Sequence, residues 1–160
     1  MELEIRSLSK TDVDSIWKIN EDGLPGTGKV SRDEIKELFD FASLAVGAYY
    51  SEELVGFVIC LPPKTAYSSL NYAWFNQRYN EFLYVDRIAV ATQYQNQKIG
   101  TTIYDYVKRN AVENGIPVTA EVNIQPPNPG SMRFHDRHGF QQVGVLEHDK
   151  KSVAMFVYQY

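Results

Sequence analysis

The segment from Asp86 to Ile103, DRIAVATQYQNQKIGTTI, contains the spacing that points most directly to chemistry. A strand-like start leads into a polar turn that ends at Gly100, and a helical pattern follows. The backbone N–H groups in the first turn of a helix have no partner inside that helix, and they point outward. Such a helix start binds anions, so this turn favours a phosphate or diphosphate ligand.

A second glycine-rich segment, GLPGTGKV at residues 23–30, matches part of the phosphate-binding loop G-x-x-x-x-G-K-[ST]. That loop needs a strand before it and a Ser or Thr after the lysine, where the hydroxyl holds magnesium. Here an amphipathic helical pattern precedes the segment, and Val30 stands in the hydroxyl position. We therefore interpret the segment as an ordinary loop and expect no nucleotide hydrolysis.

Two carboxylates lie inside apolar strand patterns, where each is a candidate general base. Glu121 interrupts the apolar alternation of residues 118–122, and Asp86 shares the predicted strand face of Tyr84 and Ile88. The alternatives are structural: Glu121 can accept hydrogen bonds from a nearby loop, and Asp86 can pair with a neighbouring arginine.

His135 and His138 lie three residues apart in a short helical pattern. Either can cap the end of that helix, and His135 can also act as a proton donor. A metal site needs a third ligand that is not found nearby, so we expect no metal.

Alternating strand and helix patterns position these residues. Strand patterns occur at residues 2–8, 45–50, 54–61, 82–90, 118–123, 141–146 and 153–158. Apolar residues recur at helical spacing around residues 13–19, 35–39 and 99–111, and Asn128 begins a short helix that ends at His138. The aromatic segment before residue 81 has no sustained period and stays unassigned.

The composition describes one domain over residues 1–160, with 16 Lys plus Arg against 20 Asp plus Glu and a net charge of −4. This balance argues against nucleic acid as a partner. No window has the length or apolarity of a membrane span, so we expect a cytoplasmic protein. Cys60, the single cysteine, lies in an apolar run and is predicted to be a core thiol.

The motifs QNQKIG, at residues 95–100, and AEVNIQPPNPGSMRFHDRHGF, at residues 120–140, resemble two motifs of the GNAT superfamily of N-acetyltransferases. With NYAWFNQRYNEFLYVDRIAV, they are similar to a subgroup of predicted acetyltransferases of unknown substrate. The order of elements matches over nearly the whole chain. The resemblance implies an α/β (α+β) fold with a mixed, mostly antiparallel sheet of about seven strands and about four flanking helices.

The resemblance also implies that acetyl-CoA is the co-substrate and that the turn holds its diphosphate. Lys98 stands where the family usually has its first glycine, so its side chain either crowds the site or points to solvent and adds a favourable charge; we favour the second. The implied coenzyme-binding residues are Ile88, Ala89, Val90, Gln95, Asn96, Gln97, Lys98, Ile99, Gly100, Thr101, Asn128 and Ser131.

A primary amine acceptor has a pKa of about 10.4, so its deprotonation at pH 7 costs about 4.6 kcal/mol and requires a base. The first choice for this base is Glu121, and the second is Asp86. His135 would protonate the leaving thiolate, at a position where the family more often has tyrosine. The acceptor itself, a small molecule or a peptide, stays open.

Two further hypotheses compete with this one. The chain can be a coenzyme-binding module without turnover, as Lys98 and the missing tyrosine suggest. Alternatively, the aromatic tract from Tyr67 to Tyr84 can form a protein-interaction surface or a homodimer edge, because it holds more rings than one half-buried strand needs. The same tract can instead form a wall of the acceptor pocket.

Overall fold

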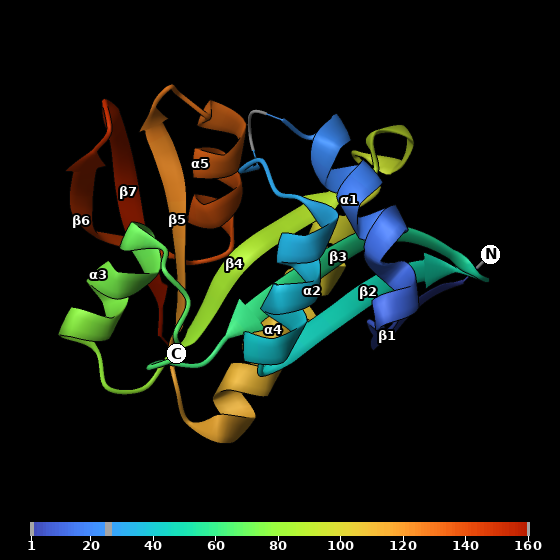
Figure 1. The fold of residues 1–160 in the computed structure, drawn as a ribbon, viewed down its shortest axis with the longest axis horizontal. Coiled ribbons are helices and arrows are strands. Elements are labelled where there is room, and N and C mark those ends of the chain that lie inside the picture. Colours follow the sequence, from blue (N-terminus) through green and yellow to red (C-terminus); the bar gives the residue numbers. More distant parts are fainter. Residues whose placement is uncertain (1, 25–26, 160) are drawn as a thin grey trace.

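A twisted sheet of seven strands forms the centre of the computed structural model, which describes residues 2–24 and 27–159 (Figure 1). The strand order is β1-β2-β3-β4-β5-β7-β6, and every neighbouring pair is antiparallel except β4 with β5. The strands are β1 (Leu3–Ser7), β2 (Leu44–Tyr50), β3 (Glu53–Leu61), β4 (Leu83–Val90), β5 (Val118–Gln125), β6 (Gln141–His148) and β7 (Lys151–Tyr158). The predicted sheet is confirmed.

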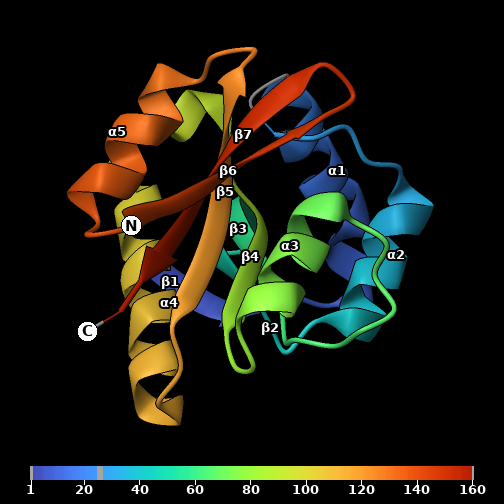
Figure 2. The same ribbon diagram turned by 90° about the vertical axis from the view of Figure 1, so that its left-hand side faces the viewer.

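Helices cover both faces of this sheet (Figure 2). Three of them, α1 (Val13–Asp22), α2 (Arg32–Phe41) and α3 (Leu70–Arg78), lie on one face; α4 (Ile99–Asn114) and α5 (Pro129–Arg137) lie on the other. Each layer encloses its own cluster of buried apolar side chains. Cys60 is fully buried on β3, as the apolar run predicted.

The helix that the sequence pattern missed is α3, so the described part of the chain has five α-helices where about four were expected. Its apolar residues have no helical period because aromatic side chains on several sides of α3 are buried, among them Tyr72, Trp74 and Phe75. These rings pack inside the core. The excess of rings that suggested an interaction surface is therefore explained by packing.

The sheet opens between β4 and β5. Only two residue pairs join these parallel strands, Leu83 with Val118 and Tyr84 with Thr119. Beyond them the strands diverge, as Figure 1 shows, and β4 continues paired with β3 alone. This divergence leaves one edge of β4 free for a ligand, at the centre of the sheet.

A bulge on β4 lies at the start of this opening. Two consecutive residues of β3 face Val85 and Arg87, so Asp86 is the extra residue on β4. The bulge reverses the alternation of side chains: Tyr84 packs beneath the α1–α3 layer, whereas Ile88 packs towards the α4–α5 layer. The predicted common face of Tyr84, Asp86 and Ile88 is therefore wrong, because period-2 reasoning does not foresee a bulge.

Candidate active site

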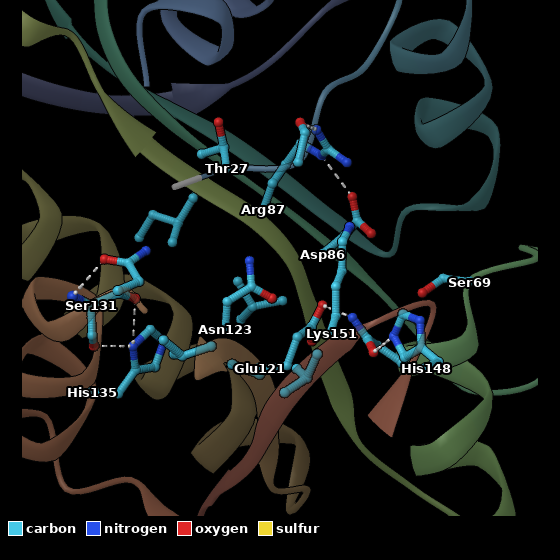
Figure 3. Close-up of a pocket in the computed structure, with 18 of the residues that line it drawn as sticks. Thr27, Ser69, Asp86, Arg87, Glu121, Asn123, Ser131, His135, His148 and Lys151 are labelled. Atoms are coloured by element: carbon cyan, nitrogen blue, oxygen red, sulfur yellow. Dashed lines mark hydrogen bonds and ion pairs between the residues drawn. The ribbon is translucent and has the colours of Figure 1, made fainter. Parts of the chain in front are cut away.

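A cavity of about 250 Å³ fills the opening between β4 and β5 (Figure 3). Side chains from β4, β5, α3, α5 and the β6–β7 hairpin line it. Glu121, Asp86 and His135, the three predicted catalytic residues, all line this cavity, although they lie far apart in the sequence. Figure 3 shows Glu121 between Asn123 on one side and His148 on the other.

Glu121 lines the cavity, and only one of its two carboxyl oxygens accepts hydrogen bonds from the residues that the structure describes. Its Oε1 accepts a hydrogen bond from the Tyr84 hydroxyl at 2.7 Å and another from Asn71 Nδ2 at 3.3 Å. Its Oε2 is buried and has no hydrogen-bond partner among the described residues. Burial raises the pKa of Glu121 to about 8, although both hydrogen bonds favour its ionised form.

The carboxyl of Asp86 forms an ion pair with the neighbouring arginine. Its Oδ2 lies 2.8 Å from Arg87 Nε, and both side chains of this ion pair are largely buried. Arg87 also donates hydrogen bonds to Asn20 Oδ1, at 3.2 Å, and to the carbonyl oxygen of Gly28, at 3.0 Å. The pair therefore fastens the bulge to α1 and to the loop after it, which matches the structural alternative for Asp86. Pro25 and Gly26 of the glycine-rich segment lie outside the described residues.

A longer groove continues from the cavity along α4 and α5. All the residues that were predicted to bind coenzyme line this groove except Gln97. Thr27, Ile88, Asn128, Ser131 and His135 line both spaces, so the groove and the cavity are continuous. A ligand in the groove can thus reach the carboxyl of Glu121.

The start of α4 forms one end of the groove. The first intrahelical bond runs from Thr102 N to Lys98 O, which leaves the N–H groups of Ile99, Gly100 and Thr101 without helical partners. Lys98 has a φ of +62°, in the left-handed region that favours glycine, and its side chain is exposed. The lysine therefore takes the backbone conformation of a glycine while its side chain points to solvent.

Gly100 leaves the groove open by having no side chain. A Cβ atom at this position would lie 3.2 Å from Cζ of Phe134 on α5, closer than most such contacts. Opposite, the Asn128 side chain accepts a hydrogen bond from Ser131 N and caps α5, as predicted. Asn128 and Ser131 thus hold the helix that forms the far wall.

The surroundings of His135 favour its neutral ring over the predicted imidazolium. Its Nδ1 lies 2.8 Å from the carbonyl oxygen of Ser131, to which it donates, and its Nε2 accepts from the Tyr104 hydroxyl at 2.7 Å. Burial lowers the pKa of His135, so the neutral ring is the favoured state. His135 therefore fastens α5 to α4 through both nitrogens.

His138, which caps the C-terminal end of α5, lies near Thr101 Oγ1 and Lys108 Nζ. No group of three side chains suited to metal binding is found within residues 2–24 and 27–159. Over the same residues, no helix has the length and apolarity to cross a membrane.

Comparison with known proteins shows the family to which the chain belongs. The chain matches the Acetyltransferase (GNAT) family over residues 13–140 and belongs to it. The GNAT domain and the N-acetyltransferase relative support acetyl-CoA-dependent acetyl transfer, as the motifs predicted. Acetyl-CoA is the co-substrate that membership of this family implies. Its diphosphate would suit the free N–H groups at the start of α4.

A curated relative supports this assignment. The chain is 26% identical over 117 residues to the probable N-acetyltransferase san of Drosophila melanogaster, across 73% of this chain. The aligned part spans 57% of the length of that relative. The substrates of the longer protein therefore do not transfer directly.

Solved structures show the same fold. Arabidopsis thaliana NAA60 in complex with a bisubstrate analogue has a TM-score of 0.77 and 18% identity, with 98% of this chain and 97% of that chain covered. The ribosomal-protein-S18-alanine N-acetyltransferase of Escherichia coli has a TM-score of 0.76 and 15% identity, with 98% and 92% covered.

Sequence reasoning missed the residues that hold Glu121. Asn71 belongs to the unassigned segment that became α3, and His148 to the end of β6, where it hydrogen-bonds Asn71 at 3.2 Å. Tyr84 was placed on a predicted strand, but no local pattern shows that its hydroxyl donates a hydrogen bond to Glu121, 37 residues away. The parallel contact of β4 with β5 is the signal that would have paired Tyr84 with Glu121, and the expected mixed sheet did not say which strands are parallel.

Proposed function

We propose that the enzyme transfers the acetyl group of acetyl-CoA to a primary amine of a small molecule or peptide, by direct attack of that amine on the thioester. The observation that carries this proposal is the free Oε2 of Glu121, buried in a cavity that is continuous with the coenzyme groove. A buried carboxyl oxygen without a partner is costly unless a ligand donates to it.

Glu121 is well matched to an amine. An ordinary glutamate lies about six pKa units below a primary ammonium, whereas a glutamate with a pKa of about 8 lies only about 2.4 units below it. The proton transfer then costs about 3 kcal/mol instead of about 8 kcal/mol. Burial therefore makes Glu121 a stronger base, at the cost of having it mostly protonated at pH 7.

The proposed reaction balances with this one base. The ammonium gives a proton to Oε2 of Glu121, and the free amine forms a C–N bond to the thioester carbon. The C–S bond then breaks, and the second nitrogen proton goes to the departing sulfur, giving an amide and free coenzyme A. A thiol has a pKa of about 8.5, so its thiolate leaves readily and a neutral His135 does not prevent this step.

The groove positions the donor for this attack. The free amides at the start of α4 suit the diphosphate, and the unpaired edge of β4 at Ile88–Val90 offers backbone groups to the pantetheine arm. The arm then follows β4 towards the cavity, which brings the thioester to Glu121. The exposed charge of Lys98 adds to the attraction for the diphosphate.

A free-thiol release assay tests the proposal. Acetyl-CoA is incubated with a panel of small amines, amino acids and short peptides, and the products are identified by mass spectrometry. We expect thiol release with a subset of amines and an acetyl group on their nitrogen. Release that is equal without any amine, or acetylation of hydroxyl compounds alone, would contradict the proposal.

A further inference from the structure

A chain of two hydrogen bonds connects Glu121 to the β6–β7 hairpin (Figure 3). His148 Nε2 lies 3.2 Å from Asn71 Oδ1, and Asn71 Nδ2 lies 3.3 Å from Glu121 Oε1. These three residues come from β6, α3 and β5, which are far apart in the sequence. Asn71 is thus held between a ring on one strand and a carboxyl on another.

The chemistry of the groups fixes the direction of this chain. A base must be ionised before it takes a proton, and an ionised carboxylate only accepts hydrogen bonds, so Asn71 must present its NH2 group to this form of Glu121. The amide oxygen of Asn71 then faces His148, whose Nε2 must carry a proton to donate to it. Without this donor, the amide of Asn71 can rotate and turn its oxygen to Glu121, where it would repel the ionised form.

We infer that His148 is a positioning residue for the base: it holds Asn71 so that the amide donates to Oε1 of Glu121 and leaves Oε2 for the amine. This inference rests on the proposed role of Glu121. Tyr84 donates to the same Oε1 at 2.7 Å, so both donors lie on one oxygen and the other stays free. The two bonds thereby fix which oxygen faces the cavity.

The packing around the hairpin supports this arrangement. Trp74 of α3 lies against Gly144 of β6, where a Cβ atom would approach its Cζ2 to 2.6 Å. This close contact docks α3 on β6 and sets the distance between Asn71 and His148. The other ionisable groups that line the cavity are Asp86 and Arg87 on β4, Tyr67 before α3, Tyr104 on α4, His135 on α5 and Lys151 on β7. His148 Nδ1 lies 3.5 Å from the exposed Asp149.

The test measures the pKa of Glu121 directly, by following its 13C-labelled side-chain carboxyl with NMR as the pH is raised. Glu121→Gln identifies the signal. Because the donor bond favours the ionised form, we expect Asn71→Ala and His148→Ala each to raise this pKa by about half a unit or more. His148→Gln keeps an N–H donor and should restore the wild-type value, and Glu147→Gln, on the opposite face of β6, should leave it unchanged.

A double variant distinguishes positioning from a direct effect. If His148 acts through Asn71, then His148→Ala adds no further shift in a chain that already carries Asn71→Ala. An equal shift in both backgrounds, or no shift from His148→Ala alone, would overturn the inference. The titration needs no acceptor, so a failure of the amine assay leaves this result readable by itself.

Discussion

The groove that we propose binds acetyl-CoA and the cavity that we propose holds the amine adjoin, yet they present different atoms to a ligand. The groove offers backbone N–H groups at the start of α4 and along the free edge of β4. The cavity offers side chains, above all Glu121, whose environment depends on partners from distant elements. Substitution in the groove therefore acts through space and charge, whereas substitution in the cavity removes the reactive group itself.

This difference separates binding from catalysis. A change at the start of α4 should alter the affinity for acetyl-CoA, because no reacting atom lies there. A change at Glu121 should alter the rate of the chemical step, because the coenzyme does not depend on that carboxyl for binding. Four predictions test how cleanly this division holds.

The largest effect is expected from Gly100→Glu. Its side chain meets Phe134, where a Cβ alone would lie 3.2 Å from Cζ, and its charge repels the diphosphate. We expect the Kd for acetyl-CoA, measured by calorimetry, to rise by more than about 100-fold. Gly100→Ala tests the steric part alone and should weaken binding by only a few fold. Equal affinity for Gly100→Glu and wild type would remove the diphosphate from this site.

Glu121→Gln should give the next largest effect, on turnover. Glutamine keeps the shape of the side chain but cannot accept a proton, so turnover with the best amine should fall at least about tenfold. The Kd for acetyl-CoA should stay close to wild type. In the wild type, the rate should rise with pH up to about 8 as Glu121 ionises. A flat rate between pH 6 and pH 9 would exclude Glu121 as the base.

The difference between groove and cavity also explains which features could be predicted from the sequence. Apart from Gly23 and Thr27, the residues of the groove lie in two short segments, 88–101 and 128–137. Their chemistry depends on a local feature, a polar turn before an amphipathic helix. The order of strands and helices also follows from local period and caps such as Ser31 with Glu34, whose capping box is present. These parts could be predicted because neighbours in the sequence determine them.

The cavity depends on contacts that no local pattern encodes. Asn71 lies in an aromatic segment without helical period, and Asp86 is displaced by a bulge that exists only in the paired strands. The state of His135 follows from its burial against Tyr104, 31 residues away. Its sequence position suggested an acid, and the structure instead gives it two hydrogen bonds that hold α5 in place.

A smaller effect of Glu121 concerns stability. Burial raises the pKa of Glu121 from 4.5 to about 8. Between these two pH values the folded protein therefore keeps the proton, whereas the unfolded chain has already lost it. Glu121 should therefore cost the wild type up to about 5 kcal/mol of folding free energy as the pH rises from about 4.5 to about 8. Glu121→Gln should lose less stability over this range, as measured by urea unfolding at several pH values. Parallel curves for both proteins would show that Glu121 keeps its ordinary pKa.

The smallest effect is expected at Lys98, where binding by backbone and binding by side chain can be separated. Lys98→Gly relieves the left-handed backbone at φ +62° but frees the unfolded chain, so the free energy of unfolding should change by less than about 1 kcal/mol. Lys98→Gln keeps the backbone strain and removes only the charge. Since the side chain is exposed, both variants should weaken acetyl-CoA binding by about two- to fivefold at low salt. The difference from wild type should shrink in 0.5 M salt, because the Debye length falls from about 10 Å at 0.1 M salt towards about 3 Å at 1 M salt. If Lys98→Gly binds as tightly as wild type while Lys98→Gln binds weakly, then the backbone conformation, and not the charge, controls the diphosphate site.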